Sequence, residues 1–326
     1  MKLRTLGRSG LNVSEMGLGC WQLGDDFGPV DDQRAQAVLA TADQVGINFW
    51  DTADVYGAGL SEQRLGQHIA SNPGDRIIAS KVGRDGALYP DGYTKEKVQR
   101  NIEGTVKRLG VEALDLIQLH CVPTEVLKDG DMLAWMEDFQ QAGLIKHFGV
   151  SVETMDEALF AVKHPKLTSI QTIFNVFRQD HINQLFPQAE ANQVGIIVRL
   201  PLASGVLSGK FTSNQQFATS DHRNYNKDGA AFSVGETFSG VPFEQAVALA
   251  DELKALCPEG YSLAQMSLRW LLDQPAVSSV ICGASRAEQV RENASVSDLA
   301  PLSRELHDQL SSFYFDKVKS LIRGVM

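Results

Sequence analysis

Cysteine is scarce in this chain, and its few copies lie far apart. Cys20, Cys121, Cys257 and Cys282 are spread over 326 residues, with no close pair and no spacing typical of metal ligands. A disulfide framework is therefore disfavoured, and no metal site is expected. Three of the four cysteines end or follow apolar runs, so we expect buried free thiols.

Long apolar runs and an excess of positive charge are also missing. No window approaches the ~20 apolar residues of a membrane span, and residues 1–7 lack the features of a signal peptide. We therefore expect a soluble cytoplasmic protein with no membrane partner. The formal net charge of −10 disfavours a nucleic-acid partner, because binding to phosphates needs a cationic surface. It leaves room for a local basic pocket that binds one small anion.

The overall composition is that of an ordinary globular protein, with 43% hydrophobic and 21% charged residues. A chain of this length can hold two average domains, but single α/β barrels also reach it. No polar linker rich in Pro and Gly interrupts the pattern of elements. We therefore expect one domain over residues 1–326.

Short apolar segments alternate with helical patterns along the chain. The apolar segments are continuous rather than alternating, which indicates strands buried on both faces, as in a parallel sheet. A hairpin of Lys2–Leu6 and Leu11–Glu15 comes first. The predicted strands that follow are Met16–Gly19, Ile47–Trp50, Arg76–Ser80, Leu114–Leu119, Ile145–Val150, Ser169–Ile173, Gly195–Leu200 and Val277–Ile281.

Helical periodicity follows these strands. The predicted helices are Gln33–Val45, one that begins with Ser61 as its cap, Thr94–Leu109, Met132–Ala142, Met155–Val162, Gln184–Asn192, Phe243–Leu256, Ser262–Leu272, Arg286–Ala294 and Leu302–Phe315. Eight strand–helix units predict a single (β/α)8 TIM barrel of the α/β class, with an N-terminal β-hairpin and extra C-terminal helices. Residues 213–240 form a long irregular segment that we expect to overhang the barrel mouth, where long loops are functional or mobile.

Four reactive side chains occur at the ends of three consecutive predicted strands. Asp51 follows the second strand, Tyr56 lies in the loop after it, Lys81 follows the third strand and His120 follows the fourth. Each one has an ordinary structural explanation: a loop anchor, a solvated lysine or a core histidine. Their common position argues for one active site, because barrel enzymes build their sites at the C-terminal ends of the strands.

The combination suits proton transfer to a carbonyl oxygen. A free tyrosine, with a pKa of about 10, is a poor proton donor or acceptor at neutral pH. A neighbouring ammonium favours the phenolate and lowers that pKa, and a carboxylate would keep the lysine charged and oriented. An imidazole beside the phenol can hydrogen-bond a substrate oxygen. We therefore expect these groups to protonate a carbonyl as a hydride reaches its carbon.

At these residues the chain resembles the aldo-keto reductase superfamily. Residues 51–57 read Asp-Thr-Ala-x-x-Tyr-Gly, and residues 57–66 read Gly-x-Gly-x-Ser-Glu-x-x-Leu-Gly. The resemblance covers essentially the whole chain and is closest in style to bacterial reductases and potassium-channel β subunits. It implies the barrel, NADPH as hydride donor, and a catalytic tetrad of Asp51, Tyr56, Lys81 and His120 with Tyr56 as the general acid.

The resemblance also implies where the nicotinamide end of NADPH/NADP+ binds. The implied contacts are Cys20, Trp21, Asp51, Ser151, Gln171 and Arg199. Arg199 departs from the pattern, because many members carry an aromatic ring there that stacks on the nicotinamide. A planar guanidinium can stack as well. It would add positive charge beside a ring that is cationic when oxidised, so it bears on the direction of catalysis.

Two further segments match the family's phosphate and adenosine sites. The implied pyrophosphate contacts are Pro201, Leu202, Ser204 and Lys210, with Arg223 as a second clamp, and a glycine-rich turn with a lysine is a fair diphosphate cradle. The implied adenosine and 2′-phosphate contacts are Gly283, Ser285, Arg286, Gln289 and Asn293. Ser285 and Arg286 begin a helix, where backbone N–H groups and the macrodipole favour an anion. Arg286 is the main argument for NADPH over NADH.

The leading hypothesis is an NADPH-dependent enzyme that reduces aldehydes and ketones. One alternative is an NADP-dependent sugar or polyol dehydrogenase that works oxidatively. Another is a regulatory subunit that binds NADPH as a redox sensor, and a third is a Schiff-base aldolase with Lys81 as nucleophile. The expected partner is a small carbonyl or sugar substrate, and the oligomeric state stays open.

Overall fold

Eight parallel strands close into a barrel. The computed structural model describes residues 1–219 and 221–325. Neighbours around the barrel run in the order β10-β3-β4-β5-β6-β7-β8-β9, so β10 pairs with both β9 and β3. The strands are β3 (Met16–Gly19), β4 (Phe49–Asp51), β5 (Ile77–Val82), β6 (Leu114–His120), β7 (Ile145–Ser151), β8 (Ser169–Ile173), β9 (Gly195–Arg199) and β10 (Val277–Gly283). The predicted (β/α)8 barrel is confirmed.

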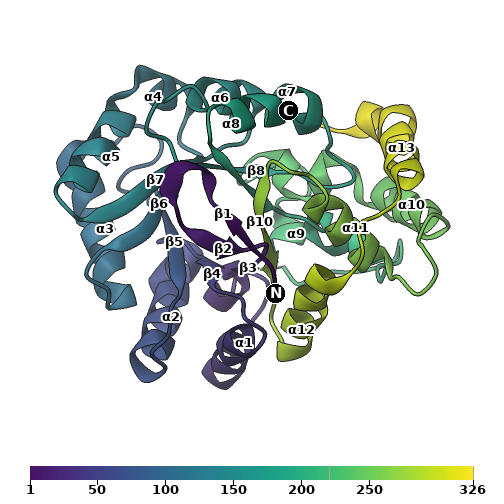
Figure 1. The fold of residues 1–326 in the computed structure, drawn as a ribbon, viewed down its shortest axis with the longest axis horizontal. Coiled ribbons are helices and arrows are strands. Elements are labelled where there is room, and N and C mark those ends of the chain that lie inside the picture. Colours follow the sequence, from purple (N-terminus) through teal and green to yellow (C-terminus); the bar gives the residue numbers. More distant parts are fainter. Residues whose placement is uncertain (220, 326) are drawn as a thin grey trace.

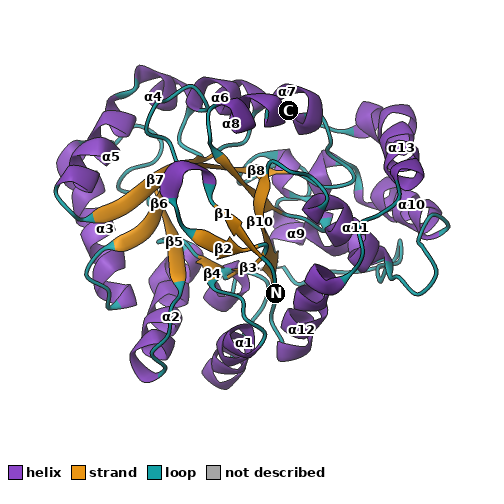
Figure 2. Cartoon of the chain, viewed as in Figure 1, coloured by secondary structure: helices purple, strands orange, loops and turns teal. Residues whose placement is uncertain are grey.

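Helices surround the barrel, most of them in an outer ring (Figures 1 and 2). They are α1 (Asp32–Gln44), α2 (Leu60–Ser71), α3 (Lys95–Leu109), α4 (Thr124–Asp129), α5 (Asp131–Gln141), α6 (Met155–Ala161), α7 (His181–Gln184), α8 (Phe186–Ala191), α9 (His222–Tyr225), α10 (Phe243–Lys254), α11 (Leu263–Leu272), α12 (Ala287–Ser295) and α13 (Arg304–Phe313). Polar caps fix several helix starts: Thr154 and Ser262 each form a capping box that satisfies free backbone N–H groups.

The N-terminal hairpin closes one end of the barrel. It consists of β1 (Leu3–Thr5) and β2 (Asn12–Ser14), paired antiparallel as expected, and Figure 1 shows it lying across that end. Leu6 and Val13 are fully buried and belong to one cluster with Phe49, Leu116 and Ile197 from inside the barrel. The hairpin packs against the N-terminal ends of the strands, so the opposite end forms the mouth.

The observed boundaries differ from the expected ones at the mouth. Asp51 and His120 are the last residues of β4 and β6, and Lys81 lies inside β5 rather than after it. The three side chains are therefore held by the hydrogen-bonded sheet. Ser61 lies within the first turn of α2 and is not its cap. Its hydroxyl donates instead to the carbonyl oxygen of Cys20, 2.8 Å away.

The long loop, residues 213–219 and 221–240 of the described chain, is more ordered than expected. It contains α9 and two short 3-10 turns, Val234–Glu236 and Phe238–Gly240. Phe238 is 1% exposed and belongs to the main hydrophobic core, which fixes the end of the loop against the barrel. The loop therefore brings defined side chains to the mouth.

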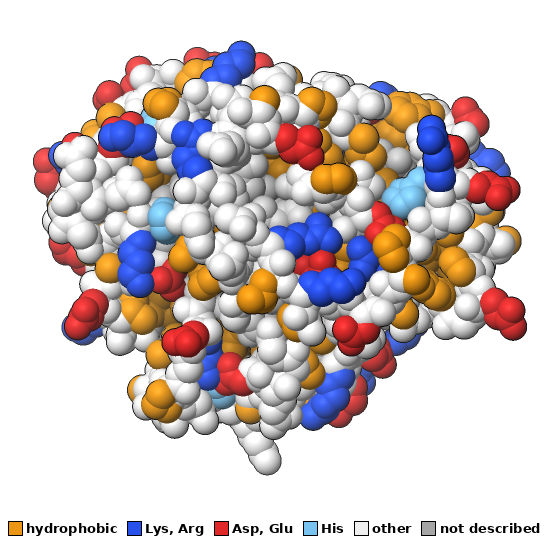
Figure 3. Space-filling view, in the orientation of Figure 1, with side chains coloured by type: hydrophobic (Ala, Val, Ile, Leu, Met, Phe, Trp, Pro, Cys, Tyr) orange, Lys and Arg blue, Asp and Glu red, His pale blue; other side chains and the backbone are white. Residues whose placement is uncertain are grey.

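The outer surface carries mixed charge. Figure 3 shows Lys and Arg side chains interspersed with Asp and Glu over the face that bears the hairpin. Among the helices of the described residues, none is long and apolar enough to cross a membrane.

Candidate active site

Lys81 lies between Asp51 and Tyr56 and contacts both side chains. Its ammonium donates hydrogen bonds to the Asp51 carboxylate and, at 2.8 Å, to the carbonyl oxygen of Thr52. The same ammonium lies 3.1 Å from the phenolic oxygen of Tyr56. Lys81 is 1% exposed, so a strong partner is required to keep its charge stable there. The three side chains therefore act as one unit.

Burial changes the acidity that we expected for Tyr56. Desolvation is the largest effect and raises the pKa of Tyr56 to about 12, although the Lys81 ammonium lowers it as predicted. The expectation of a net lowering is thus wrong for the protein without cofactor or substrate. For Lys81, burial disfavours the charged form, but attraction to Asp51 is strong enough to raise the pKa of the lysine. The resting site holds a protonated phenol beside a charged ammonium.

His120 lies beside Tyr56 as a neutral imidazole. The two rings are edge to face, with centroids 6.0 Å apart. Burial, then repulsion from Lys81, Arg84 and Arg199, lowers the pKa of His120 well below its ordinary value. Its Nδ1 is buried and has no hydrogen-bond partner among the described residues. A neutral imidazole carries one N–H group, which can donate to an uncharged carbonyl oxygen.

Two amides hold the second oxygen of Asp51. The side-chain nitrogens of Gln118 and Gln171 donate to it at 2.9 and 2.8 Å. Gln171 therefore faces the tetrad in addition to the cavity. Gln118 was not predicted, although a glutamine inside an apolar strand that is fully buried was a usable signal.

One wall of the site is aromatic. Trp21 stacks on Tyr56, with ring centroids 5.6 Å apart, and meets the edge of Phe27 at 4.9 Å. His222, from α9 in the long loop, packs 4.9 Å from Trp21. Phe232, also from the long loop, lies 6.2 Å from the same ring. The long loop thus helps to shape the cavity next to the phenol, as its position in the sequence predicted.

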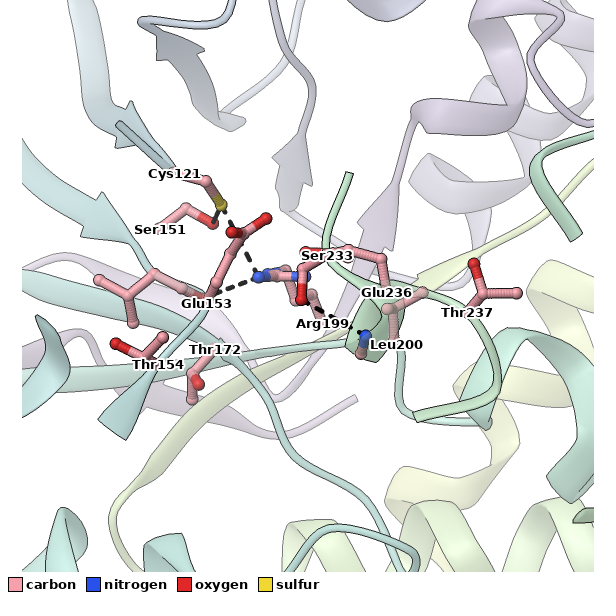
Figure 4. Close-up of polar contacts among 12 residues, drawn as sticks. Cys121, Ser151, Glu153, Thr154, Thr172, Arg199, Leu200, Ser233, Glu236 and Thr237 are labelled. Atoms are coloured by element: carbon pink, nitrogen blue, oxygen red, sulfur yellow. Dashed lines mark hydrogen bonds and ion pairs between the residues drawn. The ribbon is translucent and has the colours of Figure 1, made fainter. Parts of the chain in front are cut away.

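The other wall is charged. Arg199, at the end of β9, forms an ion pair with Glu236 of the long loop and donates to the carbonyl oxygen of Val152 at 2.8 Å. Figure 4 shows its guanidinium between Glu236 and the thiol of Cys121. A second ion pair joins Arg84 and Glu153 at 2.8 Å. The sequence did not predict Arg84, Glu153 or Glu236. Arg199 and Glu236 are 37 positions apart, Arg84 and Glu153 are 69 positions apart, and no motif links either pair.

All these groups line one cavity of about 920 Å³. Every expected cofactor contact lines the same cavity: Cys20, Trp21, Asp51, Ser151, Gln171, Arg199, Pro201, Leu202, Ser204, Lys210, Arg223, Gly283, Ser285, Arg286, Gln289 and Asn293. Tyr56 and His120 line it as well, whereas Lys81 lies buried beneath them. The cavity therefore runs from the tetrad to the start of α12, as a long ligand would need.

The far end of the cavity has an exposed arginine at a helix start. Arg286 is the N-cap residue of α12, one position before the helix begins. Ser285 is engaged within the chain, because its backbone N–H and its hydroxyl lie 2.9 and 3.3 Å from the Gln289 side-chain oxygen. Arg286 and the helix terminus together favour an anion.

Arg223, the second cation expected to contact the phosphates, is less available for an anion than Arg286. Arg223 forms an ion pair with Asp221 at 2.5 Å, and its guanidinium lies 4.5 Å from the Phe217 ring centroid. Its charge is compensated within the long loop. Lys210 is exposed and remains the more available cation at this part of the cavity.

The cavity also shows features that suit a bound cofactor. The end of the Gln22 side chain lies over Gly283, where a Cβ would come within 2.1 Å of its amide nitrogen, so a larger residue there would displace the Gln22 amide. The Gln22 side-chain oxygen is buried and, like Nδ1 of His120, has no hydrogen-bond partner among the described residues. Polar atoms left free in this way lie at both the tetrad and the β10 side of the cavity.

Comparison with known proteins defines the family. The model of the Aldo/keto reductase family matches residues 15–314. The chain is 31% identical to the uncharacterized oxidoreductase YqkF of Bacillus subtilis over 310 residues, which cover 94% of each chain. The protein therefore belongs to the aldo/keto reductase family, whose members are oxidoreductases that bind a nicotinamide cofactor.

Solved structures agree with this assignment. The glycerol dehydrogenase AKR11B4 from Gluconobacter oxydans superimposes with a TM-score of 0.81 at 26% identity, covering 100% of this chain and 98% of the other. The holo form of the aldo-keto reductase AKR11C1 from Bacillus halodurans gives a TM-score of 0.77 at 25% identity over 96% of each chain. The similarity thus extends over the whole barrel and its loops.

Proposed function

We propose that this protein is an NADP(H)-dependent oxidoreductase that reduces aldehydes or ketones to alcohols, with Tyr56 as the general acid. The observation that carries the proposal is the placement of one buried ammonium, Lys81, between Asp51 and Tyr56. This unit lies under a cavity long enough to be lined also by Arg286. A neutral His120 beside Tyr56 completes the proton-transfer site.

The bound cofactor would supply a hydride to the carbonyl carbon. The Tyr56 hydroxyl protonates the carbonyl oxygen as negative charge develops there, which is general acid catalysis. The phenolate that remains is stabilised by the Lys81 ammonium, and a solvent proton restores the phenol. The neutral His120 imidazole donates its N–H to the carbonyl oxygen and so orients it. Asp51 keeps Lys81 charged, and Gln118 and Gln171 hold the Asp51 carboxylate in place.

Different residues along the cavity would contact different parts of the cofactor. Trp21, Ser151 and Gln171 would contact the nicotinamide end, and Ser204 with Lys210 the pyrophosphate. Arg286 would bind the 2′-phosphate as a planar charged fork at a helix start. The absence of a competing carboxylate on Arg286 among the ion pairs of the described residues supports this role.

The same groups support the reverse reaction. An alcohol hydroxyl would lose its proton to the Tyr56 phenolate as hydride leaves the carbon. A structural relative named as a glycerol dehydrogenase favours keeping polyol or sugar oxidation as the second candidate. We propose a reducing, cytoplasmic setting, because the four cysteines of the described chain are free thiols.

Cofactor oxidation and cofactor binding test the proposal together. Purified protein should consume NADPH in the presence of a panel of aldehydes, ketones and sugars, and the reverse reaction should be run with NADP+ and the matching alcohols. NADPH should quench tryptophan fluorescence, because Trp21 lines the cavity. Failure to bind either form of the cofactor would sink the proposal.

A further inference from the structure

The ion pair between Arg199 and Glu236 is a feature of the cavity that the proposed mechanism does not use. Both side chains line the cavity, and each is about one-tenth exposed. Glu236 comes from the long loop, whereas Arg199 ends a barrel strand. The backbone of Glu236 is held in place, because its carbonyl oxygen accepts a hydrogen bond from the Ser204 hydroxyl at 3.2 Å. The pair is therefore a built part of the mouth.

Positive groups around the tetrad are each matched by a carboxylate. Lys81 pairs with Asp51, Arg84 with Glu153, and Arg199 with Glu236. Tyr56 and His120 are neutral in the resting site. The region that receives the nicotinamide is thus close to electrically neutral, although it contains three buried or half-buried cations.

Neutrality matters because the two forms of the cofactor differ in charge at the ring. The oxidised nicotinamide carries a positive charge and the reduced ring is neutral, so an unmatched guanidinium would disfavour only the oxidised form. We propose that Glu236 sets the preference of this site between oxidised and reduced cofactor by neutralising Arg199. This inference rests on the proposed function and adds to it a residue of the long loop that has no chemical role in proton transfer.

The cluster around Arg199 has another conceivable use as a metal site. Single ligand atoms of Cys121, Glu153 and Glu236 lie within 4.8 Å of one another. The guanidinium of Arg199 already contacts the Cys121 sulfur at 3.8 Å and pairs with Glu236, as Figure 4 shows. The cation at this place is the arginine of the chain itself. The cluster therefore acts on what binds beside it through charge rather than through coordination.

Binding constants for the two cofactor forms test the inference. Dissociation constants for NADP+ and NADPH should be measured by tryptophan quenching for the unaltered protein, Glu236→Gln, Arg199→Gln and the double variant. A unit charge about 10 Å away, at an effective dielectric constant of about 20, changes an equilibrium by roughly tenfold. In Glu236→Gln the ratio of the NADP+ constant to the NADPH constant should rise by about tenfold. That change equals about 30 mV in the midpoint potential of the bound two-electron couple.

The other variants separate charge from structure. Arg199→Gln leaves the Glu236 carboxylate unmatched, so the ratio should fall, and the double variant should return to within about twofold of the original ratio. Glu244→Gln removes an exposed acid from α10 with the same change in net charge, and its ratio should stay unchanged.

Two results would overturn the inference. If Glu236→Gln weakens both forms equally, Glu236 only holds the long loop in place and does not select between them. A ratio that shifts equally in Glu244→Gln would show a general effect of net charge. Both results leave the proposed function intact, whereas an unaltered protein that binds neither form overturns the proposed function and this inference together.

Discussion

The ammonium of Lys81 lies 3.1 Å from the phenolic oxygen of Tyr56, in a place where only 1% of the lysine is exposed. A charged donor that is shielded from water is already oriented, and in the low local dielectric it interacts strongly with any charge that forms nearby. In the proposed mechanism, the phenolate produced when Tyr56 gives up its proton is such a charge. Under that proposal, the Lys81–Tyr56 pair contributes more to the transition state than to the resting protein.

Replacement of Tyr56 by phenylalanine tests the proton donor directly. The ring and its stacking on Trp21 remain, so the Kd for NADPH should stay within about twofold, while kcat for carbonyl reduction falls by about 10²–10⁴-fold, the usual contribution of a general acid. Fluorescence titration and steady-state rates measure the two effects. Tyr261→Phe removes a hydroxyl outside the cavity lining and should leave both values unchanged. Normal turnover in Tyr56→Phe would contradict the mechanism.

Replacement of Lys81 by methionine should change the pH dependence as well as the rate. Lys81 lowers the pKa of Tyr56 against the larger effect of burial, and the net pKa is about 12. Without the ammonium this pKa rises further. Alcohol oxidation needs the phenolate, so its rate increases with pH, and in Lys81→Met that increase should move to higher pH. Reduction needs the protonated phenol and should lose rate without such a shift, by about 10²-fold or more.

A surface lysine provides the matched control for this profile. Lys95 pairs with Asp138, and both side chains are about half exposed. Lys95→Met should keep the profile of the unaltered protein in both directions. An oxidative profile in Lys81→Met that coincides with the original would mean that the ammonium does not set the acidity of Tyr56.

The barrel and the proximity of Asp51, Tyr56, Lys81 and His120 could be predicted because they depend on short-range sequence features. Continuous apolar runs mark buried parallel strands, and the C-terminal ends of such strands meet at one mouth. Asp51, Lys81 and His120 needed only their positions at strand ends. The exact ends were missed by one or a few residues, since hydrogen bonding within the sheet extends β4, β5 and β6 beyond the apolar runs.

The charged wall could not be predicted, because it depends on how the long loop folds back. Glu236 belongs to the first of two 3-10 turns of the loop, and the burial of Phe238 in the core fixes the end of the loop beside Arg199. No periodicity in residues 213–240 indicates this. The net acidity of Tyr56 was misjudged for a related reason. Sequence indicates that a lysine is near, but the degree of burial that outweighs its charge is a property of the packed site.

Replacement of Arg286 by alanine tests the preference for NADPH. Arg286 is exposed at the start of α12 and is free to meet a 2′-phosphate. A hydrogen bond to a charged group is worth about 1.5–3 kcal/mol, so the Kd for NADPH should rise by roughly tenfold or more. The Kd for NADH should change by less than about threefold. Arg291→Ala, on the exposed face of the same helix, is the control. An equal loss for both cofactors in Arg286→Ala would refute the proposed contact.

The stability of the fold should fall in mild acid, in part through His181. This residue is 5% exposed, and its Nε2 lies 2.9 Å from the Thr172 hydroxyl. Burial, then repulsion from Arg178 and Arg199, lowers the pKa of His181 to about 3. An unfolded histidine has a pKa of about 6.5 and binds its proton first as pH falls. The stabilising contribution is therefore complete above that value and is lost between it and pH of about 3.

Replacement of His181 by asparagine should remove this part of the acid sensitivity. For the pKa values of about 6.5 and about 3, the free energy of unfolding contributed by His181 drops by about 2 kcal/mol between pH 7 and pH 5. Asparagine keeps a hydrogen-bond partner for Thr172 and has no proton to gain. Urea unfolding at pH 7 and at pH 5 gives the difference in the free energy of unfolding between the two pH values. A loss of stability that is the same at both pH values cancels in this difference. His147 is only half-buried, and burial lowers its pKa as well. His147→Asn should therefore reduce the difference in unfolding free energy between pH 7 and pH 5 by less than His181→Asn does. If His181→Asn leaves the difference in unfolding free energy between pH 7 and pH 5 unchanged, this histidine already binds its proton in the folded protein near neutral pH.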